Sequence, residues 1–184
     1  PDYTGRLLDL LKKEEVKAAF FVVTREAVKE EALIDRMLSE GHVVGFHSMD
    51  HQNAMVRGYL HTRKDFRTGS EFMKRKGISD IWYRPPWGLT NLFSWHFVRK
   101  YGMKMVLWDV MAEDWERGAT AGSIRKKCLS RVKDGSILCL HDGGRRTGGA
   151  PGAPEKTLEA LTYVIPALKE AGCRFILPSE AVFR

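Results

Sequence analysis

The sequence predicts an α/β fold in which short parallel strands alternate with helices, and three observations predict it. Short apolar runs alternate with amphipathic stretches of roughly 10–15 residues, the pattern of βαβ units. Glycines follow the ends of four amphipathic stretches, where they commonly stop helices: Gly41, Gly77, Gly102 and Gly172. Histidine and acidic residues come directly after the apolar runs, where catalytic groups collect in α/β folds.

The first third of the chain is expected to form helix, strand, helix and strand. Residues 7–15 carry a cluster of leucines typical of a helix. Residues 18–23 are continuously apolar, which favours a strand buried on both faces. Residues 26–39 have apolar side chains at helical spacing and end before a glycine. Residues 42–46 read as the next strand.

The middle of the chain repeats this order. Residues 60–76 are expected to form a helix, and residues 81–83 a short strand that ends at Pro85. A second helix is expected at residues 91–101, followed by a strand at residues 103–110. The alternation continues the pattern expected of a parallel sheet, either open or closed into a barrel.

The last third is expected to form two more helix and strand pairs. The helices are expected at residues 121–133 and 155–171, and the strands at residues 136–140 and 174–177. Between them, residues 143–154 are rich in Gly and Pro. This stretch does not fit GxxxxGK[ST], so we expect a loop beside the site rather than a phosphate cradle.

Composition limits the class of protein. The 184 residues fit one domain, and 43% apolar with 29% charged residues is ordinary for a globular protein. No run approaches the roughly 18 apolar residues of a membrane span, and no signal peptide is visible. Because the chain opens at Pro1 without an initiator Met, a removed targeting segment or anchor stays open.

The net charge of +7 favours acidic partners. The basic residues lie in short scattered clusters, without a recognition-helix pattern or an RNA-binding aromatic motif, so nucleic acid is not expected as a partner. A solvated basic surface and a surface that attracts an anionic polymer or cell wall both stay open. The three cysteines form no CxxC, and Cys139, inside an apolar run, is expected to be a buried small hydrophobe.

The first reactive cluster is His47-Ser-Met-Asp-His51, directly after the strand expected at residues 42–46. Two imidazoles four residues apart can bind one divalent metal, which would also need a third ligand and an open position for water. Ser48 could orient the loop, while Asp50 is close but awkwardly placed. The alternative is that one histidine only caps or packs the strand end.

Three further clusters follow other expected strands. Arg84-Pro-Pro-Trp-Gly88 is a rigid loop that could hold a guanidinium and a backbone N–H in place. Asp114 and Trp115 could tune a neighbouring base and wall a pocket, and His141 could act as a general acid. Each has a structural alternative: a strand-ending turn, a solvated acidic loop, or a histidine bonded to Asp142.

Together, the four clusters resemble motifs two to five of the polysaccharide deacetylases, the NodB-homology family or carbohydrate esterase family 4. They occur in the family's order, and the resemblance covers essentially the whole chain. It implies a distorted (β/α) barrel of about seven parallel strands. It also implies that residues 1–184 form a single catalytic domain that lacks the first motif and the first strand, both expected ahead of Pro1.

The resemblance also assigns roles. It implies that His47 and His51 bind a divalent metal, most simply Zn²⁺ although Co²⁺ or Ni²⁺ could replace it, and that Ser48 steadies the loop. The Trp87 N–H would form part of the oxyanion hole, and Arg84 would orient the catalytic base. The missing motif, Thr-Phe-Asp-Asp-Gly, would supply both that base and the third metal ligand.

In the second half of the chain, the resemblance makes His141 the general acid and Asp114 the residue that tunes it. Trp115 and Cys139 would wall the pocket for the acetyl methyl. The family usually has Tyr at position 87 and Leu at position 139. A backbone donor survives the first change, and the second loosens the methyl pocket.

The function implied is a metal-dependent hydrolase that removes acetyl groups from N-acetylglucosamine-containing polysaccharide, such as peptidoglycan or chitin oligomers. The alternatives are a carbohydrate-binding pseudo-enzyme without the base, and an esterase or amidase acting on acetylxylan or a small amide. A monomer in the extracellular space or cell envelope is expected, and the cytoplasm stays open. Arg145 and Arg146 are expected at the rim of the site, either solvated or steering an anionic polymer.

Overall fold

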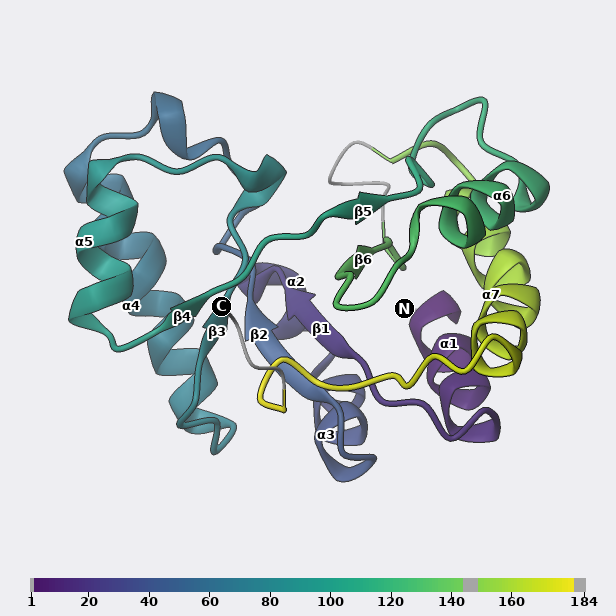
Figure 1. Cartoon of the computed structure of the whole chain (residues 1–184). Helices are drawn as coiled ribbons and strands as arrows, with labels where there is room; N and C mark the ends of the chain where they lie inside the picture. Colours follow the sequence, from purple (N-terminus) through teal and green to yellow (C-terminus); the bar gives the residue numbers. More distant parts are fainter. Residues whose placement is uncertain (1, 144–148, 181–184) are drawn as a thin grey trace. The chain divides into compact units, whose positions relative to one another are not determined.

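The computed structural model describes residues 2–143 and 149–180. The chain divides into two compact units, which are described separately (Figure 1). Unit 1 contains Pro1–Ala18, Trp108–Ile176 and Glu180–Arg184, whereas unit 2 contains Ala19–Leu107 and Leu177–Ser179. The expectation of one domain over residues 1–184 stays a prediction.

Unit 2 is built on a parallel sheet of four strands in the order β1-β2-β3-β4. These strands are β1 (Ala19–Val22), β2 (Val43–Phe46), β3 (Trp82–Tyr83) and β4 (Lys104–Met105). In register, Phe46 at the end of β2 lies beside Tyr83 at the end of β3. Parallel neighbours with matched ends place the loops that follow β2 and β3 at the same edge of the sheet, which positions the candidate site.

Helices connect these strands, and aromatic side chains form the core between helices and sheet. The helices are α2 (Thr24–Ala27), α3 (Glu31–Ser39), η1 (Ala54–Val56), α4 (Tyr59–Arg75), η2 (Pro86–Gly88) and α5 (Leu92–Lys100). The rings of Phe46, Phe66, Tyr83 and Phe97 are buried and contact one another. A side chain at Gly69 of α4 would meet the Phe46 ring at 2.3 Å, so the absence of a Cβ lets α4 approach β2.

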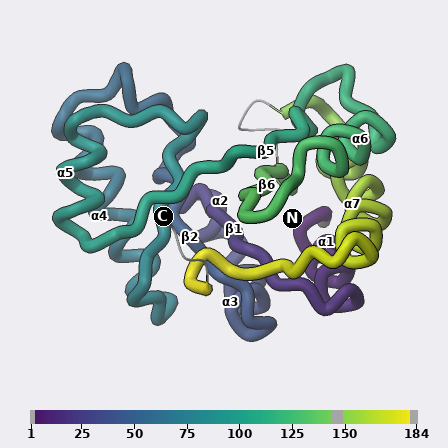
Figure 2. The backbone as a smooth tube through the Cα atoms, in the orientation of Figure 1, coloured from purple at the N-terminus to yellow at the C-terminus, as the bar shows by residue number. Residues whose placement is uncertain are grey.

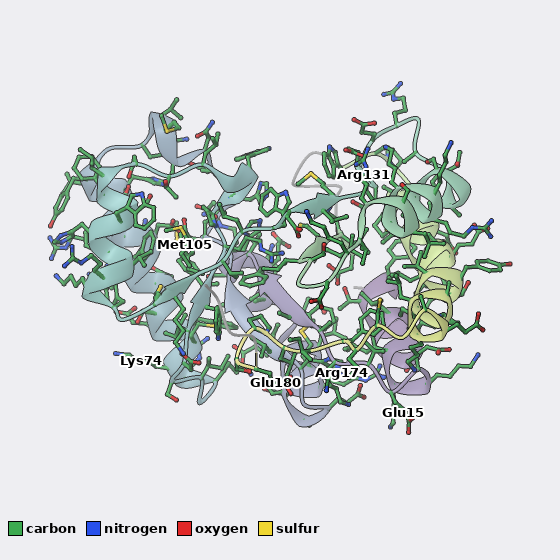
Figure 3. The ribbon with its side chains drawn as sticks, viewed as in Figure 1. Glu15, Lys74, Met105, Arg131, Arg174 and Glu180 are labelled. Atoms are coloured by element: carbon green, nitrogen blue, oxygen red, sulfur yellow. The ribbon has the colours of Figure 1, made fainter. Side chains whose placement is uncertain are left out.

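Among its described residues, unit 1 has a smaller parallel sheet and three helices. The elements are α1 (Asp2–Lys13), β5 (Val110–Met111), α6 (Ala121–Arg131), β6 (Leu138–Cys139) and α7 (Ala153–Glu170). The strands pair in the register Val110–Leu138 and Met111–Cys139. The tube in Figure 2 follows α7 beside α6 and α1, and contacts join α7 to both. The sheet ends just before His141, which sets the position of that side chain. Figure 3 adds side chains to the ribbon of Figure 1.

The predicted α/β class with parallel strands is confirmed, but three elements differ from their prediction. The helix expected at residues 26–39 is divided into α2 and α3. The strand expected at residues 103–110 is divided into β4 and β5, and the boundary between the units falls between them. Residues 174–177 form no strand, because no described neighbour pairs with them in either sheet.

The described residues contain six strands in two sheets, so the barrel of about seven strands stays an expectation. In the part of the chain that the structure describes, no helix combines the length and apolar character needed to cross a bilayer.

Candidate functional site

The loop after β2 holds His47 at the edge of the unit 2 sheet. The His47 N–H donates to the Val22 carbonyl at 3.0 Å, which continues the β1–β2 pairing by one residue. Its ring Nδ1 lies 2.6 Å from the Arg84 carbonyl, just after β3. A carbonyl can only accept, so Nδ1 carries the proton and the ring's lone pair is on Nε2. This is the arrangement by which proteins usually orient a metal-binding imidazole.

His51 is held by a strained turn. The Ser48 hydroxyl accepts the His51 N–H at 2.8 Å, and Ser48 itself is buried. Ser48 and His51 have φ of 65° and 52°, a left-handed conformation that residues with a Cβ rarely adopt. Strain of this kind costs of order 1–3 kcal/mol and persists where the surroundings impose it. The role of Ser48 in steadying the loop stays a prediction.

The two imidazoles are placed to share one ion. Their ring centres lie 5.0 Å apart. Two imidazoles bound to one zinc at roughly 2.0–2.1 Å and a tetrahedral angle would have ring centres about 5 Å apart. The pair therefore fits two ligands of a divalent metal. Among the residues that the structure describes, no third His, Cys, Asp or Glu completes a cluster of three.

The loop after β3 brings Arg84 and Trp87 to the same edge. The Arg84 guanidinium lies 4.2 Å from the centre of the Phe21 ring and donates to the Leu107 carbonyl at 2.9 Å. Trp87 has a left-handed φ of 53° and packs its ring 4.5 Å from that of His51, centre to centre. The expected strand-ending loop therefore holds both an anchored cation and the tryptophan beside the imidazole pair.

Asp65 is a residue of this region that the sequence analysis missed. It lies on the buried face of α4, and its carboxylate accepts the Met49 N–H in the middle of the histidine loop. Burial, partly offset by this hydrogen bond, raises the pKa of Asp65 to about 7. A signal was present: a carboxylate falls one helical turn from Thr62 and Gly69, on the apolar stripe of the helix.

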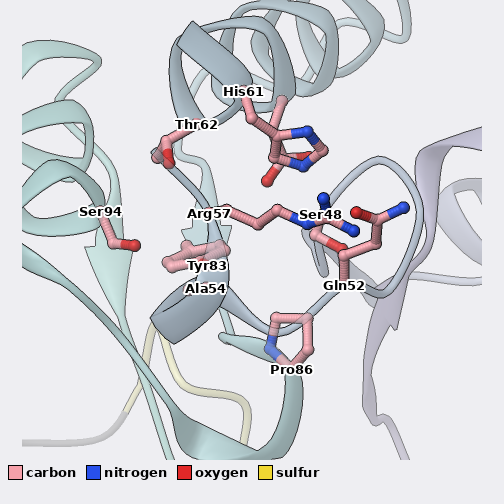
Figure 4. Close-up of a pocket in the computed structure, with 10 residues that line it drawn as sticks. Ser48, Gln52, Ala54, Arg57, His61, Thr62, Tyr83, Pro86 and Ser94 are labelled. Carbon is pink, nitrogen blue, oxygen red and sulfur yellow. The ribbon is translucent and has the colours of Figure 1, made fainter. Parts of the chain in front are cut away.

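A small polar cavity lies against this loop. Figure 4 shows Ser48, Gln52 and His61 around it. Asp65 also lines the cavity, and burial there lowers the pKa of His61, with nearby Arg57 acting in the same direction. The carboxylate below the loop thus faces polar groups rather than hydrocarbon.

Unit 1 contains a histidine and aspartate pair. His141 follows β6, and its Nδ1 lies 2.8 Å from Asp114 Oδ1. The His141 backbone N–H donates to Asp114 Oδ2 at 2.7 Å, and Thr157 Oγ1 lies 2.9 Å from the same oxygen. Asp114 is 0% exposed. The carboxylate therefore fixes both the position and the ring orientation of His141. Thr157 is a second residue that the sequence analysis missed, and in this case no sequence pattern pointed to it.

The other predicted residues of unit 1 surround or support this pair. The Trp115 ring packs edge-on to His141, 5.0 Å between centres, and Cys139 is buried in β6. Asp142 accepts the Thr4 hydroxyl at 2.7 Å rather than bonding His141. Asp109 accepts the Ile137 N–H at 2.6 Å and so orders the entry to β6.

Within each unit, then, predicted residues meet: His47, His51, Arg84 and Trp87 in unit 2, and Asp114, Trp115 and His141 in unit 1, where Cys139 is buried in β6 just ahead of His141. The arginines at 145 and 146 lie outside the described residues. Asp50 pairs with Arg25 at 2.6 Å. The roles expected of the site residues stay predictions.

Known proteins resemble this chain over most of its length. The family model described as polysaccharide deacetylase matches residues 1–106. A peptidoglycan-N-acetylglucosamine deacetylase of Bacillus cereus is 30% identical over 98% of this chain and 82% of its own length.

Solved structures agree with the sequence comparison. A peptidoglycan N-acetylglucosamine deacetylase in complex with 4-naphthalen-1-yl-N-oxidanyl-benzamide is 29% identical, with a TM-score of 0.87 over 97% of this chain and 80% of the other. A family 4 acetyl xylan esterase from Clostridium thermocellum, solved with a cobalt ion, is 30% identical, with a TM-score of 0.84 over 97% of this chain and 82% of the other.

The chain spans smaller shares of other relatives. It covers 63% of a second peptidoglycan-N-acetylglucosamine deacetylase from Bacillus cereus, and 35% of the deacetylase PgdA from Listeria monocytogenes.

Proposed function

Because this chain belongs to the polysaccharide deacetylase family, we propose that it is a metal-dependent carbohydrate N-deacetylase. Its substrate would be an N-acetylglucosamine polymer of the peptidoglycan or chitin-oligomer kind. The names of the similar proteins support this choice, and they also support a location in the cell envelope or outside the cell. In this proposal residues 1–184 form one catalytic domain that lacks the first motif, and the protein is a monomer.

His47 and His51 would hold the metal through Nε2. Zinc is the proposed ion, because two neutral imidazoles and an oxygen ligand suit it, although cobalt fits the same donors. The third ligand would be the carboxylate that the resemblance places ahead of Pro1. When bound, the ion would act as a Lewis acid toward the acetamide carbonyl and the attacking water.

Trp87 and Arg84 would act on the carbonyl side of the reaction. The left-handed turn at Trp87 fixes the direction of its backbone N–H, which would donate to the oxyanion of the tetrahedral intermediate. Such a donor contributes roughly 2.7–4 kcal/mol. Arg84, anchored by Phe21 and the Leu107 carbonyl, would orient the base.

The single observation that carries the proposal is the contact of His141 with the buried Asp114. An amine is a poor leaving group, so amide hydrolysis needs a proton donor. A carboxylate at Nδ1 stabilises the positive ring that holds this proton, while Nε2 would deliver it to the nitrogen. Trp115 and Cys139 would line the space for the acetyl methyl, and the shorter Cys side chain would leave that space roomier than Leu would.

Product analysis on a substrate panel tests the proposal. The zinc-loaded protein, in a form that includes the first motif, would be incubated with peptidoglycan, chitin oligomers and acetylxylan, and both acetate and new amino groups would be measured. We expect acetate and amine in equal amounts from the first two substrates, and loss of both after chelation. Release from acetylxylan alone would favour the esterase alternative. Binding of chitin oligomers without any release would favour the pseudo-enzyme.

A further inference from the structure

Unit 2 carries an exposed apolar surface outside the candidate site. Met55, Val56, Leu60 and Leu92 have 61%, 74%, 75% and 85% of their surface exposed. A soluble domain rarely gathers several large aliphatic side chains at such exposure. We call these four residues the apolar patch.

The patch comes from two segments that are tied together. Met55 and Val56 lie in η1. Asn91 Nδ2 donates to the carbonyls on either side of them, that of Ala54 at 2.6 Å and that of Arg57 at 2.9 Å. Asn91 directly precedes Leu92 and caps α5.

Aromatic packing continues this link between the helices. The rings of Tyr59 and Phe93 contact each other with centres 5.7 Å apart, which joins the start of α4 to the start of α5. Figure 1 shows α4 and α5 side by side, and contacts between the two helices agree. The apolar side chains are therefore held together by an ordered framework.

The charge around the patch is predominantly positive. In the segments 54–67 and 89–100 every exposed charged residue is basic, and the one acid, Asp65, is buried. The exposed cations are Arg57, Arg63, Lys64, Arg99 and Lys100, together with Arg67, which pairs with the exposed Glu71 at 3.9 Å. Arg63 and Lys64 stand one turn after Leu60 on the same face of α4. Trp95, half exposed, stands one turn after Leu92 on α5.

We propose that this surface docks on an anionic lipid bilayer. Moving aliphatic side chains from water to the acyl boundary of the bilayer lowers the free energy of binding, and so does bringing cations close to anionic headgroups. An exposed tryptophan is typical of the headgroup region. An anionic polysaccharide would pair with the cations but would leave the leucines and valine in water. If a second copy of the chain docked there through the same surface, the basic residues of one copy would face those of the other and repel them.

Vesicle sedimentation tests the proposal with the whole chain. The probes are vesicles of phosphatidylcholine alone and vesicles with about a third phosphatidylglycerol. We expect binding to the anionic vesicles, and a blue shift of tryptophan emission that Trp95→Phe removes. Leu60→Ser/Leu92→Ser should lower the partition coefficient at least about tenfold. Arg63→Gln/Lys64→Gln should lower it roughly 10- to 30-fold at ~0.1 M salt.

Matched variants in unit 1 serve as controls. Leu129→Ser removes an exposed leucine of α6, and Lys126→Gln/Lys133→Gln removes two exposed cations. Both should bind vesicles as the unchanged protein does. All variants are compared by circular dichroism and by acetate release from a soluble chitin oligomer, which should not change.

Three outcomes would overturn the proposal. One is equal binding of neutral and anionic vesicles, or binding to neither. Another is sedimentation with isolated peptidoglycan alone that depends on Arg63 and Lys64 but not on Leu60 and Leu92, which would assign the surface to the polymer. The third is concentration-dependent self-association that Leu60→Ser/Leu92→Ser abolishes, which would assign it to a second copy.

Discussion

The rings of His47 in unit 2 and His141 in unit 1 are both held at Nδ1, but by different acceptors. His47 faces the neutral Arg84 carbonyl at 2.6 Å, whereas His141 faces the buried Asp114 carboxylate at 2.8 Å. A neutral carbonyl orients a neutral imidazole, the form that binds metal. A carboxylate also stabilises a positively charged imidazolium, the form that donates a proton. The acceptor at Nδ1 thus suits the His47 imidazole to binding a metal and the His141 imidazole to donating a proton.

The largest effect is expected at the imidazole pair. We expect His47→Ala/His51→Ala to lose bound zinc and, with it, acetate release down to the level of the chelated protein. Elemental analysis after dialysis against sub-stoichiometric zinc measures the metal content. His96→Ala, which removes an exposed histidine of α5, is the control and should keep the metal. Unchanged metal content in the double variant would exclude these two ligands.

His141 should matter for the proton and not for the metal. We expect His141→Ala to lower kcat for N-acetyl substrates by about 10²–10⁴-fold, the usual contribution of general acid catalysis, while zinc content stays constant. An ester with a good leaving group should lose far less, because its alcohol needs the proton less. Amide hydrolysis within a few-fold of the unchanged protein would remove His141 from the proposed role.

Much of this arrangement was predictable from the sequence. Helices such as α4 and α7 have long amphipathic patterns with glycine or polar residues at their ends. The sequence therefore predicts both helices, with bounds correct to within a few residues. The histidines were recognised because reactive side chains follow apolar runs, and a parallel sheet brings such positions to one edge. The short strands were less exact, since two paired residues suffice to define β3 or β6.

The supporting residues were not predictable in the same way. Thr157 reaches Asp114 across 43 positions of sequence, and a threonine in the first turns of a helix carries no mark of such a partner. Asp65 meets Met49 through a backbone group, which has no side-chain identity to detect. The division of the expected strand 103–110 likewise depends on which neighbours are present to pair, a property of tertiary structure.

Unit 2 also has a buried carboxyl, that of Asp65, but it accepts the backbone N–H of Met49 and not a histidine ring. Its pKa is raised from 3.8 to about 7. Below pH 3.8 the carboxyl is protonated in the folded and the unfolded chain alike. Between pH 3.8 and about 7 only the unfolded chain releases the proton. The free energy of unfolding should therefore fall as pH rises through this window, by at most about 1.4 kcal/mol per pH unit.

Asp65→Asn keeps an oxygen acceptor for Met49 and removes the titration. We expect its free energy of unfolding, measured by urea denaturation, to vary less between pH 4 and 7 than that of the unchanged protein. Asp80→Asn, which changes a half-exposed carboxyl paired with Lys104, is the control and should retain the slope. Parallel pH curves for the protein and Asp65→Asn would show that the buried carboxyl titrates normally.

The smallest effect is expected at Thr157, which contacts the Asp114 carboxylate. A change at Thr157 tests whether the orientation of Asp114 affects proton donation by His141. Thr157→Val keeps the shape of the side chain and removes one of the polar contacts to Asp114 Oδ2, while His141 keeps both of its own. A hydrogen bond to a charged group contributes about 1.5–3 kcal/mol, and we expect a loss of stability at the lower end because two bonds to the carboxylate remain. The matched control is Thr162→Val, in the same helix, whose exposed hydroxyl donates to the Glu159 carbonyl at 2.7 Å. Urea denaturation should show a larger loss of stability for Thr157→Val than for Thr162→Val.

A several-fold fall in kcat at constant KM for Thr157→Val would show that the orientation of Asp114 affects the proton transfer. A fall in stability with unchanged kcat would show that His141 alone fixes the working position of the carboxylate.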